Sequence, residues 1–146
     1  MSSSFESNFQ FIERAIDDQA TFERVFSAFV TLFVTMEEYM EEDQIAGEHR
    51  ERFKDAVETF AMYLRVIDEI VPGLHLEGNC AFMERAARSG FPPGSQFNFF
   101  VRTLDGVRAP LAQYKVNDIT ADQCFEAMRD MLKAARVMES CLPARG

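Results

Sequence analysis

Apolar side chains recur at alternating steps of four and three residues along much of this chain, and no other feature limits its fold as strongly. This spacing places the side chains on one face of an α-helix, because a helix completes a turn every 3.6 residues. The clearest case spans residues 48–71 and consists of Phe53, Val57, Phe60, Leu64, Ile67 and Val71. A repeat close to 3.5 residues over almost three heptads predicts nearly parallel or antiparallel packing against another helix.

Three further segments show helical spacing, at residues 4–18, 20–43 and 121–142. The middle of segment 20–43 is apolar almost all round, which is typical of a helix buried on several sides. It therefore predicts either the central helix of a bundle or a helix shared with a second subunit. The last segment carries one stripe, formed by Cys124, Met128, Met131, Ala135, Met138 and Leu142.

Residues 72–119 differ in composition from the rest of the chain, since they hold five of the seven glycines and four of the five prolines. We expect them to form a cap over the long helices, including a short helix from Asn79, as N-cap, to Ser89, with Gly90 as its stop.

Within this region, residues 96–116 allow two interpretations. Asp105-Gly106 flanked by apolar residues is a hairpin signal and would give a small β-hairpin near 97–115. The other interpretation is a helix from Ser95 to Leu104, ended by Gly106 and followed by a short helix that starts at Pro110. We favour the helices, because alternation fails at Phe99 and Phe100 and because Pro110 would disrupt a strand.

These patterns together predict an all-α protein. The chain of 146 residues fits a single helical domain over 1–146. Its expected architecture is a bundle of three to four long amphipathic helices with a Gly/Pro-rich cap.

The chain carries a net charge of −9, and the acidic excess lies in the first half. Residues 1–76 contain sixteen acidic and six basic side chains, whereas residues 77–146 contain eight and nine. An acidic chain without a basic stripe is a poor binder of phosphate backbones or of an anionic membrane surface. We therefore expect a protein partner and neither nucleic acid nor membrane.

Membrane insertion and disulfide formation are both disfavoured. The longest uncharged stretch of the first half, Val25 to Met36, has twelve residues, and a membrane-spanning helix needs about twenty. Cys80, Cys124 and Cys141 lack the paired spacing of a zinc site or a disulfide framework. They predict reduced thiols and a cytoplasmic protein.

Acidic residues cluster at the end of the second predicted helix and provide the one candidate metal site. Glu37, Glu38 and Glu41 form an EExxE pattern, and Asp55 and Glu58 lie one turn apart on the next helix. Carboxylate oxygens are the ligands that Mg²⁺ prefers, so these five residues are an alternative metal set beside the reading as a solvated helix end.

The EExxE spacing resembles the first acidic motif of the all-α MazG-like nucleotide pyrophosphohydrolases. That resemblance covers about twenty residues and implies a helical, oligomeric, magnesium-dependent enzyme. The second motif of the family reads ExxD, whereas here the order is Asp55-x-x-Glu58.

Five apolar residues are candidate contacts to a partner: Met128, Met131, Met138, Phe29 and Phe33. Unbranched thioethers adapt to differing surfaces, which suits a groove for helical partners. Ordinary core filling is the competing interpretation of the same stripes.

The sequence contains no phosphate-binding glycine loop and no GxSxG nucleophile motif. We therefore expect a non-catalytic protein-interaction module, such as an adaptor, chaperone or regulator, that forms a homodimer and needs no cofactor. One alternative is a magnesium-dependent nucleotide pyrophosphohydrolase that uses the five carboxylates. Another is a small-molecule sensor in which Phe91–Phe100 closes over an apolar pocket.

Overall fold

The computed structural model describes residues 5–40, 45–113 and 118–143, and within these ranges the chain is helical without strands. In chain order the elements are α1 (Glu6–Asp17), α2 (Phe22–Tyr39), the 3-10 turn η1 (Gly47–His49), α3 (Arg50–Ile70), α4 (Glu77–Arg88), α5 (Pro93–Gly106), α6 (Arg108–Gln113) and α7 (Asp118–Ser140). The all-α prediction is confirmed for the described part of the chain. The hairpin near 97–115 is wrong as far as residue 113, because α5 and α6 occupy that segment.

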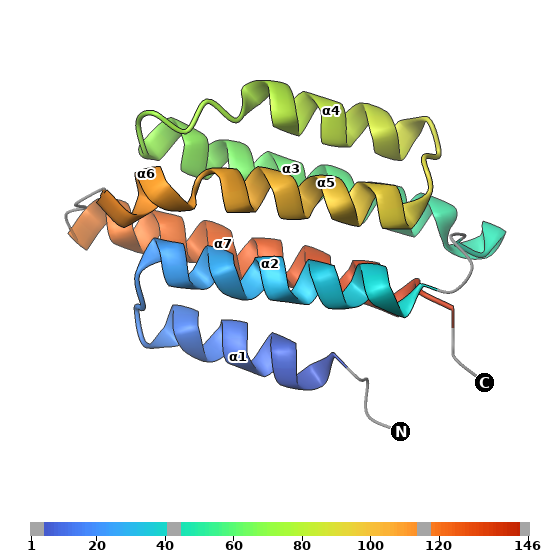
Figure 1. The fold of residues 1–146 in the computed structure, drawn as a ribbon, viewed down its shortest axis with the longest axis horizontal. Helices are drawn as coiled ribbons and strands as arrows, with labels where there is room; N and C mark the ends of the chain where they lie inside the picture. Colours follow the sequence, from blue (N-terminus) through green and yellow to red (C-terminus); the bar gives the residue numbers. More distant parts are fainter. Residues whose placement is uncertain (1–4, 41–44, 114–117, 144–146) are drawn as a thin grey trace.

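The helices form two adjoining pairs with a further helix on each side (Figure 1). One pair consists of α3 and α7, which run antiparallel, and the other of α2 and α5. Helix α4 packs against α3 and α5, and α1 packs against α2 and α7. The short α6 lies against α2.

The Gly/Pro-rich segment was expected to cap the bundle, but its helix α5 belongs to the interior. Phe97 and Phe100 of α5 are fully buried, and both rings contact Phe33 of α2, with centroids 6.0 and 5.0 Å away. Pro93 is the first residue of α5, where a proline costs no hydrogen bond because its missing N–H would have no partner inside the helix. The double proline therefore begins a core helix.

Phenylalanine rings fill the centre of the molecule, where α2, α3 and α5 meet. Phe60 of α3 contacts Phe29 and Phe33 edge to face, at 5.9 and 5.3 Å, and stacks on Phe100 at 5.4 Å. Burial of one such side chain stabilises the fold by roughly 1.5–3 kcal/mol. Favourable ring pairs add about 0.5–1.5 kcal/mol beyond the area they bury.

Helix α2 is covered by helices of its own chain. Its apolar face packs on α5, and on the side toward α1 the Thr35 hydroxyl accepts a hydrogen bond from Asn8 at 3.5 Å. The apolar surface of α2, which suggested a second subunit, is thus covered by helices of the same chain. The central-helix interpretation of α2 accounts for the packing.

Two glycines end helices in backbone conformations that favour glycine. Gly73 and Gly90 have φ angles of +89° and +71°, just after α3 and α4. The stop predicted at Gly90 is confirmed. Asn79 is not the N-cap of α4, because the helix begins at Glu77 and Asn79 donates instead to Thr103 of α5 at 3.1 Å.

No helix within the described ranges is both long enough and apolar enough to cross a membrane.

Candidate functional site

The five predicted partner contacts lie inside the molecule. Phe29, Phe33, Met128, Met131 and Met138 have no exposed surface. Their helical spacing matches one face of α2 and one face of α7, both of which pack against other helices of the same chain. In this conformation a partner would meet other residues, so any contact surface must be formed by the outer faces of the bundle.

The predicted metal ligands lie on separate parts of the molecule. Glu37 borders a surface hollow beside α5, next to Asn98. Asp55 and Glu58 border a different hollow between α3 and α4, where Glu58 accepts a hydrogen bond from Arg88 at 3.0 Å. Glu41 lies outside the described residues. Among those that are described, no group of three His, Cys, Asp or Glu side chains is arranged to hold a metal ion.

The three cysteines are free and buried. Burial raises the pKa of the Cys80 thiol to about 12 and that of Cys124 to about 11, because a thiolate loses its hydration in an apolar interior. Burial also raises the pKa of Cys141. A thiol that stays protonated near pH 7 is a poor nucleophile, so none of the three has the chemistry of a catalytic cysteine.

The outer surface of the α3–α7 pair is hollowed along much of its length. Two adjoining hollows of about 310 and 480 Å³ share Tyr63 and Asp130, and we call them together the α3–α7 groove. Its residues on α3 are Arg52, Asp55, Ala56, Thr59, Tyr63, Val66, Glu69 and Ile70. Its residues on α7 are Gln123, Glu126, Ala127, Asp130, Lys133, Ala134 and Val137.

Small side chains make the groove. Ala56 and Ala134 lie where α3 and α7 meet, and both are buried. Val137 stands at the edge with 36% of its surface exposed. Ala56, Ala134 and Val137 were not predicted from the sequence, because the helical stripes consist mainly of large apolar side chains. The alanines between the stripe positions of α7 were the available signal.

The two ends of the groove differ in charge. Arg52 and Lys133 lie in the hollow near the start of α3 together with Asp55 and Asp130, so the charges lining it offset each other, whereas Glu69 and Glu126 make the other hollow acidic. Arg52 donates to the Ser140 hydroxyl, and Lys133 lies 3.7 Å from Asp130.

Comparison with known proteins gives no relative: no family model, no curated protein and no solved structure matches the chain.

Proposed function

We propose that the protein is a non-catalytic helical interaction module that pairs with a second copy of itself through the α3–α7 groove. The observation that carries this proposal is the shape of the outer face of these two helices. It combines a floor of small residues, partly exposed apolar side chains, one end that carries charges of both signs and one acidic end. Small residues let helices approach closely, so that larger side chains from a facing helix fill the space above them.

The distribution of charge selects the partner and its direction. In a two-fold dimer, each copy offers the same surface to the other. If the facing helices run antiparallel to their counterparts, the end with Arg52 and Lys133 lies over the end with Glu69 and Glu126 of the second copy. A parallel arrangement would place like charges together. Electrostatic complementarity of this kind fixes orientation more than it adds affinity.

The dimensions of the face set the expected strength of the dimer. The groove spans Arg52 to Ile70 of α3, about 28 Å at 1.5 Å per residue. Two helices of this length packed about 9 Å apart present roughly 500 Å² to a partner. A dimer would then bury about 1,000 Å² in total, which is the lower limit for a specific complex. We therefore expect a dimer that dissociates at micromolar concentrations.

The thiols support a proposal for the compartment. Three free, buried cysteines suit a reducing environment, and we propose that the protein works in the cytoplasm.

The test is a pair of matched substitutions on exposed apolar residues. Val137→Asp places a charge in the groove, whereas Phe11→Asp places the same charge on α1, where Phe11 is 46% exposed. Sedimentation velocity over a concentration series measures the dimer dissociation constant of each. We expect Val137→Asp to remain a monomer and Phe11→Asp to pair like the wild type. A wild type that stays monomeric, or equal pairing of both variants, would contradict the proposal.

A further inference from the structure

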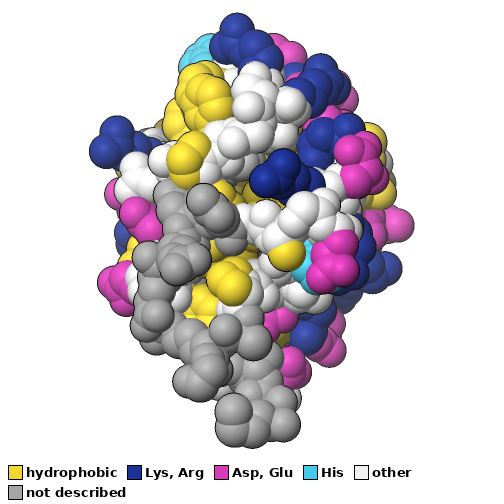
Figure 2. All heavy atoms as spheres, turned by 90° about the vertical axis from the view of Figure 1, so that its right-hand side faces the viewer, with side chains coloured by type: hydrophobic (Ala, Val, Ile, Leu, Met, Phe, Trp, Pro, Cys, Tyr) yellow, Lys and Arg dark blue, Asp and Glu magenta, His cyan; other side chains and the backbone are white. Residues whose placement is uncertain are grey.

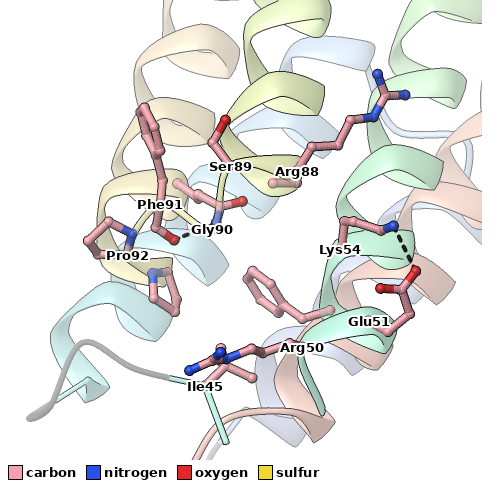
Figure 3. Close-up of a pocket in the computed structure, with 13 residues that line it drawn as sticks. Ile45, Arg50, Glu51, Lys54, Arg88, Ser89, Gly90, Phe91 and Pro92 are labelled. Carbon is pink, nitrogen blue, oxygen red and sulfur yellow. Dashed lines mark hydrogen bonds and ion pairs between the residues drawn. The ribbon is translucent and has the colours of Figure 1, made fainter. Parts of the chain in front are cut away.

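A further hollow, of about 670 Å³, lies at the end of the bundle where α3 begins. One wall is the first turn of α3, and the other is the connection between α4 and α5 (Figure 3). The volume is in the range of pockets that hold small molecules. Figure 2 views the molecule from this end, where apolar side chains lie at the surface beside basic and acidic ones.

Hydrogen bonds fix the connection that forms the second wall. The N–H of Phe91 donates to the carbonyl of Ala86 at 3.0 Å, and Gln96 Nε2 donates to the carbonyl of Phe91 at 2.9 Å. Opposite, the Phe53 ring is 4% exposed and is held edge to face against Phe97, at 5.8 Å. Both walls are therefore preformed.

The charge of the pocket is positive although the chain is strongly acidic. Among the described residues that line it, Arg50, Lys54 and Arg88 are basic and Glu51 is the one acid. Lys54 Nζ lies 2.7 Å from Glu51, and Arg88 Nε lies 3.0 Å from Glu58, outside the pocket. Two of the three cations are thus neutralised, and the described residues leave a net charge of one.

Arg50 is the cation left to a ligand. It forms no ion pair or hydrogen bond with any side chain in the described ranges. Figure 3 shows Arg50 reaching across the open space toward Ile45, whereas Lys54 turns to Glu51 and Arg88 extends away from the pocket. A single guanidinium binds the two oxygens of a carboxylate through parallel N–H donors.

Gln96 adds a hydrogen-bond acceptor that a ligand of this pocket should satisfy. Its side chain is 5% exposed, and its Oε1 accepts no hydrogen bond within the described part of the chain. The amide orientation is fixed, since only the Nε2 end can donate to the Phe91 carbonyl. A buried acceptor without a donor costs about 1–3 kcal/mol, so a ligand that carries an N–H or O–H gains by supplying one.

We propose that this pocket binds a small monocarboxylic acid with an apolar body and a hydroxyl or amide N–H close to the carboxylate. Arg50 holds the carboxylate, the body lies between Phe53 and Pro92, and the donor bonds Gln96 Oε1. A dianion such as a phosphate monoester fits less well, because one unpaired cation cannot neutralise it. This site is separate from the α3–α7 groove, and it gives the small-molecule prediction for residues 91–100 a location and a chemistry.

Isothermal titration with 3-phenyllactate and 3-phenylpropionate tests the proposal. These acids differ only by the hydroxyl group that would donate to Gln96. We expect both to bind one per chain, with 3-phenyllactate about five-fold tighter, as one hydrogen bond provides. Arg50→Gln should weaken both about ten-fold or more, whereas Arg14→Gln, an exposed change on α1, should leave both unchanged.

A second variant tests the preference for the acid that carries the hydroxyl group. Gln96→Met keeps the length of the side chain and removes the acceptor, so the two acids should bind equally. Circular dichroism checks that each variant keeps its fold. No saturable binding of either acid to the wild type, or binding that Arg50→Gln leaves unchanged, would overturn the proposal.

Discussion

Arg65 of α3 donates two hydrogen bonds to Glu84 of α4, from Nη1 at 2.8 Å and from Nη2 at 2.7 Å. Its Nε donates to Glu77 at 2.9 Å. The side chains of Arg65 and Glu84 keep only 26% and 20% of their surface exposed. These hydrogen bonds hold α4 against α3. No pattern in the sequence predicted that Arg65 would pair with Glu84.

Arg65→Ala should therefore lower the free energy of unfolding by about 1–3 kcal/mol, because it leaves Glu84 partly buried without its donors. Urea unfolding followed by circular dichroism measures the change. Arg14→Ala, on the exposed side of α1, is the matched control and should change stability by less than about 0.5 kcal/mol. Equal midpoints for the two variants would contradict a stabilising role of Arg65.

The same pair makes stability depend on pH. Arg65 lowers the pKa of Glu84 in the folded protein, chiefly through its hydrogen bonds. A carboxyl group with a lowered folded pKa contributes stability above its unfolded pKa, near 4.3, and loses it as the pH falls through the folded value. The stability difference between wild type and Glu84→Gln should be largest near pH 6 and shrink toward roughly pH 3. A difference that grows on acidification would reverse the assignment.

The reactivity of the three thiols tests whether the interior of the protein is tightly packed around them. Burial raises the pKa of Cys80 to about 12 and of Cys124 to about 11, so little thiolate exists at pH 8. We expect 5,5′-dithiobis(2-nitrobenzoate) to react with the native protein at least about 100-fold more slowly than with protein in urea. Three equivalents should react after unfolding. A native cysteine that reacts as fast as free cysteine would show that the packing around it is open.

A charge reversal tests the direction of the proposed dimer. Lys133→Glu reverses one of the two positive charges at the end near the start of α3 and should weaken pairing, most clearly at low salt. Adding Glu126→Lys in the same chain should restore much of the affinity, because the two exchanged charges again face each other across the antiparallel pair. Sedimentation of the single and double variants measures this. No recovery in the double variant would exclude the antiparallel orientation.

The sequence predicted the helices well where the spacing was strict and less well where a helix contained irregular residues. The apolar stripe of 48–71 corresponds to η1 and α3, and Gly90 ends α4 as expected. Helix α5 was taken for part of a cap because prolines and glycines surround it. Propensity describes residues one at a time, whereas Phe97 and Phe100 are interior because α2 and α3 supply rings to meet them.

The candidate sites were harder to predict than the fold. Spacing shows that Met128, Met131 and Met138 share a face, but it does not say whether that face meets a partner or the rest of its own chain. Tyr63 and Val137, which border the groove, belong to no apolar stripe. The pocket at Arg50 depends on a contact between the start of α3 and residues about forty positions later. Local pattern contains no information on such a contact.

Hydroxyl-radical footprinting at low and high protein concentration tests pairing through the α3–α7 groove without any substitution. Oxidation of a side chain slows when a partner covers it. We predict that Tyr63 and Val137 are oxidised several-fold more slowly at about 200 µM than at about 2 µM, the range expected for an interface of this size. Phe11, exposed on α1, should be oxidised equally at both. Unchanged oxidation of Tyr63 and Val137, or slowing at Phe11 instead, would contradict the account.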